Sequence, residues 1–225
     1  MRRIYLLLTL SLFATLKVSA QTPDITVNQD PSKRISIAPE SVFKMFREAG
    51  MDPVNHELTD IEKEKVENAF AMLPGLHKKI LRKHLQSISF MDNMPNSALT
   101  SPVESRDATK RFNITFRANV LNETISEWAT WKENTCYNDS AGSGYQIKVL
   151  AGDFDAFLYL LLHEATHIVD AVLQLTPHPA DKADHVLATP FTNGIWHKLL
   201  IPSEIYSDTI LEKTRFRSGM LSQLN

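Results

Sequence analysis

The sequence predicts an α+β fold, with a small mixed sheet packed on one long apolar helix and a mostly helical C-terminal part. Three observations lead to this prediction. Helical spacing dominates residues 41–85, and segments in which apolar and polar side chains alternate follow it. An apolar run that includes residues 161–170 comes soon after the last alternating segment, and beyond that run only helical signals remain.

The first three helices are predicted over 41–49, 60–73 and 76–85. The second is preceded by Thr59, a good cap residue, and starts with acidic residues, which suit a helix N-terminus. A Pro-Gly pair separates the second helix from the third. The third carries several Lys, Arg and His side chains, which we interpret as a face exposed to solvent.

Strands are predicted where alternation coincides with aromatic and β-branched residues, over 87–90, 112–120 and 145–150. The polar stretches 92–107 and 138–144 are rich in Asn, Ser, Gly or Pro and are predicted to be loops. Residues 122–131 are predicted to form a helix or a long turn. Asp153 is a candidate cap for the apolar helix that follows.

Residues 1–20 have the three parts of a secretory signal peptide. Two arginines come first, and residues 4–16 then form an apolar stretch that is too short to span a bilayer. Small residues at 18–20 provide a cleavage site. We therefore expect an exported protein, secreted or periplasmic in a bacterium.

After cleavage, the polar residues 21–37 are expected to form a flexible segment, and residues 38–225 to form a single domain. Cleavage removes three basic side chains, so the formal charge changes from −2 to −5. This charge argues against a nucleic-acid partner, which would need a basic surface. No stable membrane insertion is expected once the signal is removed. Because Cys136 is the only cysteine, no internal disulfide can form, which favours a bacterial protein.

An H-E-x-x-H motif lies in the apolar run, with His163 and His167 four residues apart and Glu164 after the first histidine. On an α-helix this spacing projects both imidazoles from one face, on adjacent turns. Two imidazole nitrogens placed in this way can share one Zn²⁺, and the glutamate can act on a metal-bound water. Asp170 is expected to orient a histidine or a backbone group beside the metal.

A catalytic zinc normally has three protein ligands and one water. Glu204 and Asp208 are four residues apart in a predicted helix that begins at Pro202, so their carboxylates share one face. We expect Glu204 to be the third ligand and Asp208 to orient a histidine. Asp181 or Asp184 is an alternative ligand, although both lie in a proline-flanked segment that is typical of a loop.

A metzincin site, H-E-x-x-H-x-x-G-x-x-H, does not fit this chain. Asp170 and Leu173 stand where that motif has its glycine and its third histidine. A peptidase also needs a donor to the oxyanion. His185 and His197, which lie between the motif and Glu204, are the candidates for that donor.

The H-E-x-x-H-x-x-D pattern and the later segment from Pro202 to Asp208 resemble those of gluzincin metallopeptidases of the zincin class. With its trailing Asp170, the first segment resembles the variant of the motif in the catalytic domain of anthrax lethal factor and in the Mlc titration factor family. The resemblance covers two short segments of the chain and implies a zincin-like fold. It also implies that His163, His167 and Glu204 bind zinc and that Glu164 is the general base. The strand at 145–150 would then lie beside the cleft, as an edge with which an extended peptide can pair.

The sequence therefore predicts an exported endopeptidase with one Zn²⁺, in which a metal-activated water and Glu164 hydrolyse a peptide or protein substrate. The alternative is a binding or surface protein without activity, built on the same fold with a vestigial or structural zinc site. The presence of Glu164 argues against this alternative, since a structural site does not need that glutamate. A module that holds zinc with all of its histidines is not supported, because their spacing is irregular.

Overall fold

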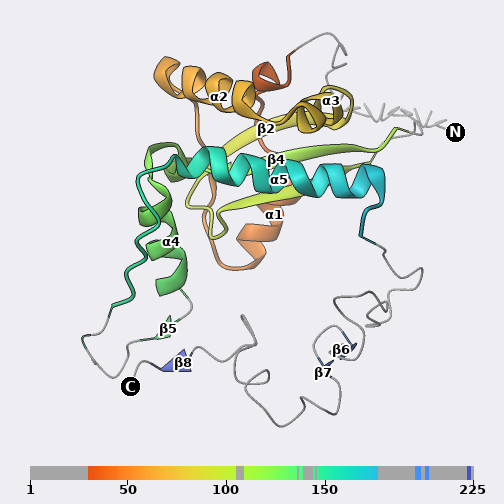
Figure 1. The fold of residues 1–225 in the computed structure, drawn as a ribbon. Helices are drawn as coiled ribbons and strands as arrows, with labels where there is room; N and C mark the ends of the chain where they lie inside the picture. The colour runs from red at the N-terminus through yellow and green to blue at the C-terminus, as the bar shows by residue number, and fades with distance from the viewer. Residues whose placement is uncertain are drawn as a thin grey trace, which may run out of the picture.

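The computed structural model describes most of the chain between Asp30 and Thr176 and three short strands beyond it. The described residues are 30–104, 109–135, 137–138, 144, 146–176, 196–198, 201–202 and 222–223. Within them, five α-helices and one four-stranded sheet make up most of the regular structure (Figure 1). The predicted mixture of helices with a small mixed sheet is confirmed.

The sheet contains β1 (Val54–Asn55), β2 (Leu85–Asp92), β3 (Ala98–Val103) and β4 (Arg111–Arg117), in the order β1-β2-β4-β3. β2 and β4 are parallel, whereas β1 and β3 pair antiparallel with their neighbours. In the described part of the chain, β3 therefore forms one edge of the sheet.

Helices cover both faces of this sheet. α2 (Asp60–Met72), α3 (Gly75–His84) and α5 (Ala156–Leu173) share the larger core cluster on one face, and Figure 1 shows α5 in front of the sheet. α1 (Glu40–Glu48) packs on the opposite face in a smaller cluster that includes Met91 of β2. The long apolar helix of the sequence is thus one layer of the fold, with the sheet behind it.

The predicted helices 41–49, 60–73 and 76–85 are confirmed to within about two residues at each end. Thr59 caps the second of them. Its side chain accepts from the backbone N–H of Glu62, whose carboxylate accepts in turn from the backbone N–H of Thr59. These are local signals, which is why the sequence predicts them well.

The prediction of a loop over 92–107 is wrong for residues 98–103, which form β3. This strand has no strong alternation and contains Pro102, so its sequence resembles a loop. It is held by antiparallel pairing with β4, from Ala98 opposite Phe116 to Val103 opposite Arg111. A partner that is distant in sequence therefore creates the strand.

The predicted strand at 145–150 is also wrong, because residues 146–150 have no strand partner. They run instead beside α4 (Ile125–Asn134), whose polar side chains satisfy their backbone groups. Asn134 donates to the carbonyl of Ile147 at 2.7 Å and accepts from its N–H at 3.2 Å. The Thr130 hydroxyl accepts from the N–H of Val149 at 2.9 Å.

Of the segment predicted to be flexible, 21–37, the structure describes residues 30–37, of which Pro31, Ser32 and Arg34 are buried and the others are exposed. Pro31–Lys33 form the short helix η1, and Ile35 bridges to Ile88 of β2. The buried Arg34 guanidinium donates to carbonyls at the C-terminal end of α3, including that of Arg82 at 2.9 Å. Carbonyls in the last turn of a helix generally lack an intrahelical partner, so the bond to Arg82 makes Arg34 a side-chain cap of α3.

Three buried aromatic rings hold α5 on the sheet. Phe157 of α5 lies 5.8 Å from Phe90 of β2 and 5.0 Å from Phe116 of β4, measured between ring centroids. Phe90 and Phe116 are themselves 5.6 Å apart across the parallel strand pair. The rings fix the position of the helix six residues before the H-E-x-x-H motif begins at His163.

The start of α5 is tied to its neighbours by main-chain and side-chain bonds. Asp155, and not the expected Asp153, is the cap residue, and its carboxylate accepts from the N–H of Leu158 at 3.0 Å. The same carboxylate pairs with Lys65 of α2 at 2.7 Å. The N–H of Ala156 donates to the carbonyl of Glu123, just before α4. These contacts set the direction in which α5 crosses the sheet.

Beyond Thr176 the structure describes only β6 (Trp196–Lys198), β7 (Ile201–Pro202) and β8 (Ser222–Gln223). β6 pairs with β7, and β8 pairs with β5 (Tyr137–Asn138). Pro202, the predicted first residue of the helix that carries Glu204, belongs instead to β7, and residues 203–221, Glu204 among them, lie outside the described residues.

A histidine with two carboxylate partners joins β1 to α2. His56 Nδ1 lies 3.2 Å from an oxygen of Asp92, and its Nε2 lies 3.4 Å from an oxygen of Glu62. Burial opposes the charge on this ring, but the hydrogen bonds and the two negative charges outweigh it and raise the pKa of His56. Burial likewise opposes the charge of Glu62, and its bonds to Thr59 and His56 outweigh it and lower the pKa of Glu62.

We expect His56→Gln to destabilise the protein more at pH 5.5 than at pH 9. A histidine whose pKa is raised by folding contributes fully below its unfolded pKa, and that contribution is lost as the pH rises through the folded pKa. The extra loss at pH 5.5 is expected to be of the order of 1 kcal/mol, since hydrogen bonds to charged groups contribute on that scale. Urea unfolding of both proteins at each pH measures it. The same loss at both pH values would contradict this role, and Glu62→Gln should reduce the pH dependence.

Candidate metal centre

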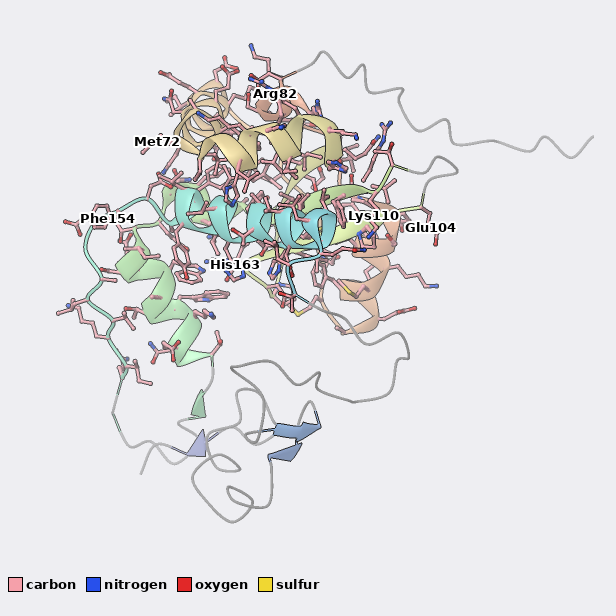
Figure 2. All side chains as sticks on the ribbon, turned by 45° about the vertical axis from the view of Figure 1, so that its right-hand side comes forward. Met72, Arg82, Glu104, Lys110, Phe154 and His163 are labelled. Carbon is pink, nitrogen blue, oxygen red and sulfur yellow. The ribbon has the colours of Figure 1, made fainter. Side chains whose placement is uncertain are left out.

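α5 has a buried face and an exposed face. Phe157, Leu161, Ala165 and Ile168 are fully buried, whereas Leu162, His163, Thr166 and His167 are exposed. Among the described helices, α5 alone has the length and apolar composition of a membrane span, and its buried face forms part of the core. The apolar helix is thus buried on one side only, and His163 lies on the side turned away from α2 and α3 (Figure 2).

His163 and His167 converge on the exposed side of α5. Their Nε2 atoms are 3.2 Å apart, and their rings are nearly perpendicular, with an interplanar angle of 85°. A carboxylate oxygen of Glu164 and one ring nitrogen of each histidine all lie within 4.8 Å of one another. The four-residue spacing therefore gives the geometry that the sequence predicts.

The separation of the two nitrogens fits a shared zinc ion. Zn–N bonds of about 2.0–2.1 Å at a tetrahedral angle place two nitrogens about 3.3 Å apart. Both rings are accessible, so further ligands can approach from solvent. The same separation also allows a hydrogen bond between the rings when one Nε2 carries a proton. Zinc binding is thus compatible with the side chains as they stand.

Glu164 differs from the two histidines because it is buried, with 6% of its surface exposed. It faces the edge strand β3, where the hydroxyl of Thr100 donates to its Oε2 at 2.6 Å. Among the residues that the structure describes, no other group donates to this carboxylate. The carboxylate is consequently held between the histidine pair and the edge of the sheet.

A third histidine, His77 of α3, contacts α5 at Thr166. Its Nε2 is 3.1 Å from the hydroxyl of Thr166, which donates to the carbonyl of Leu162 at 2.7 Å. The hydroxyl therefore accepts from His77, and this nitrogen carries the proton. The sequence places His77 on a solvated basic face, and its contact with α5 becomes visible only in the folded chain.

Asp170 closes the C-terminal end of α5. Its Oδ1 accepts from the N–H of Thr176 at 2.6 Å, and its carbonyl accepts from the N–H of Gln174, which has a left-handed backbone with φ 54°. This is a capping arrangement. The described hydrogen bonds of Asp170 do not include a histidine, so its predicted role beside the metal stays a prediction.

A small open pocket of about 400 Å³ lies beside Glu164 and His167. One wall is β3, with Ala98, Thr100 and Pro102, and Phe112 and Ala171 line other parts of it. The pocket is bounded mainly by uncharged side chains. Sequence reasoning missed it because its wall is the strand that resembles a loop.

Several predicted site residues are not placed by the structure. Glu204, Asp208 and His185 lie outside the described residues, as do the alternative ligands Asp181 and Asp184. His197 is in strand β6, for which the structure describes the backbone pairing alone. Of the predicted ligands and general base, His163, Glu164 and His167 are brought together, and the third ligand stays a prediction. Comparisons with protein-family models, with curated proteins and with solved structures find no match.

Proposed function

We propose that this protein is an exported zinc-dependent endopeptidase of the gluzincin type. The observation that carries the proposal is the geometry on α5, where two exposed imidazole nitrogens lie 3.2 Å apart with a buried carboxylate beside them. In this proposal His163 and His167 bind one Zn²⁺, and Glu204 is the third protein ligand. The fold around the site is zincin-like. Residues 1–20 direct export to the periplasm or the medium.

The chemistry follows from these side chains. Bound Zn²⁺ would lower the pKa of a water and polarise the carbonyl of the scissile peptide bond. Glu164 lies close enough to the histidine nitrogens to take the proton of that water and later give it to the leaving amine. Because Glu164 is buried against β3, its carboxylate is held in one orientation. His185 and His197 stay the candidates for the oxyanion donor.

In the part of the chain that the structure describes, the outer edge of β3 has no strand partner, which supports a peptide as the substrate. The N–H of Arg117 donates to the carbonyl of Ser97, which is opposite it in the register of β3 and β4. Hydrogen-bonded pairs alternate in antiparallel strands, so Ala98 and Thr100 turn their main-chain groups away from β4. An extended peptide can pair with those groups beside Glu164. This role was expected for residues 145–150, and β3 takes their place.

One observation favours the alternative, a binding protein without activity. The hydrogen bond between Thr100 and Glu164 joins the edge strand to α5. Glu164 therefore holds these two elements together as well as being the proposed base. A glutamate at this position is therefore compatible with a site that has lost hydrolysis. Peptidase assays of the zinc-loaded protein distinguish the two functions.

Zinc analysis tests the metal site. We expect the purified chain to hold one equivalent of zinc and His167→Ala to weaken zinc binding by at least about 100-fold, because removal of a ligand costs more than removal of a supporting group. His77→Ala, on the neighbouring helix α3, is the matched control and should bind zinc as the wild type does. Competition with a chelator of known affinity gives the constants. Equal zinc binding in His167→Ala and wild type would rule out this site.

The same titration applied to Glu204→Gln tests the third ligand. We expect a loss of zinc affinity comparable to that of His167→Ala. An unchanged affinity would remove Glu204 from the site while leaving the histidine pair in place, and Asp181→Asn and Asp184→Asn would then test the alternative ligands.

A further inference from the structure

Thr100 has two features that point in different directions. Its side chain contacts the carboxylate of Glu164 on α5, and its main-chain groups lie on the outer edge of β3. One residue therefore touches the proposed general base and also belongs to the strand where the substrate would pair.

The hydrogen bond itself is short and well placed. The Thr100 hydroxyl is 2.6 Å from Oε2 of Glu164, and α5 contacts β3 directly. Threonine is stiff at χ1 in a strand, so the hydroxyl has few other directions available to it. Because Glu164 is buried and accepts from no other described group, this bond decides which way its carboxylate points.

We infer that Thr100 is a positioning residue for Glu164, and that it links peptide pairing at the edge of β3 to the orientation of the general base. This inference rests on the proposed function. A peptide bound to the main chain of Thr100 fixes the strand, and the fixed strand holds the hydroxyl against the carboxylate. The base is then oriented when the substrate is in place.

The expected consequence is a loss of turnover rather than of binding. Without the hydroxyl, Glu164 keeps its charge but can rotate away from the histidine pair, and small misplacements of a reacting group are costly. Loss of a group that orients a site residue typically costs about 10–100-fold in activity. The outer main-chain groups of β3 remain, so the substrate should still bind.

The test compares Thr100→Val with Thr100→Ser in the full chain loaded with zinc, on a quenched fluorescent peptide library. We expect Thr100→Val to lower kcat by about 10–100-fold and to leave KM and zinc affinity within about 3-fold of wild type. Thr100→Ser keeps the hydroxyl and should restore kcat. Ser101→Ala is the matched control, because its hydroxyl is on the same strand and makes no hydrogen bond among the described residues.

The outcomes separate this inference from the proposed function. An active wild type with equal kcat in Thr100→Val overturns the role of Thr100 and leaves the peptidase proposal intact. A zinc-bound wild type that cleaves no peptide overturns both. If Thr100→Val lacks a cooperative unfolding transition, Thr100→Ala is assessed by the same kcat criterion. Failure of Thr100→Ser to recover kcat also overturns the inference.

Discussion

Glu164→Gln is expected to reduce peptide hydrolysis by at least about 10²–10⁴-fold while zinc binding remains, because proton transfer by a positioned base contributes on that scale. Glutamine keeps the length and shape of the side chain and removes its basicity. Its amide oxygen can still accept from the Thr100 hydroxyl, so the contact between α5 and β3 is preserved. The loss should therefore appear in kcat, with little change in folding.

Steady-state cleavage of a peptide library by the zinc-loaded variant gives this value, with zinc content measured on the same sample. Glu64→Gln, an exposed glutamate on α2, is the control and should be as active as wild type. A loss smaller than about 10-fold for Glu164→Gln would exclude Glu164 as the general base. Loss of zinc in this variant would instead show that the glutamate contributes to the metal site itself.

The part of the site that the sequence predicts is the part that depends on one helix. His163 and His167 come together because an α-helix repeats every 3.6 residues, which a local pattern reveals. The cap at Thr59 and the bounds of α2 are local in the same way. Contacts within one element need no knowledge of the rest of the fold.

The part that the sequence does not predict depends on pairing between distant segments. β3 has the composition of a loop, and it is a strand because it pairs with β4. Residues 146–150 alternate like a strand, but side chains of α4 satisfy their backbone groups. The partner of Glu164, Thr100, follows from the first of these arrangements, so no spacing near the motif indicates it.

The position of the proposed metal centre depends in turn on how α5 is held on the sheet. Phe157 enters the core between Phe90 and Phe116 and is completely buried. The ring lies six residues before His163, so it fixes both the depth and the rotation of the helix that carries the motif. The packing of Phe157 therefore helps to hold His163 and His167 in place.

Phe157→Ala is expected to lower the free energy of unfolding by about 3–5 kcal/mol, the cost of truncating a buried phenylalanine and leaving a cavity. Phe154→Ala is the matched control. That ring is 76% exposed just before the same helix, and its removal should cost less than about 0.5 kcal/mol. Urea unfolding with a chelator present measures both, because bound zinc would add its own stabilisation. Similar losses for the two variants would contradict the packing of α5 described above. If the packing is right, Phe157→Ala should also weaken zinc binding, since a less firmly held helix does not keep His163 and His167 beside Glu164.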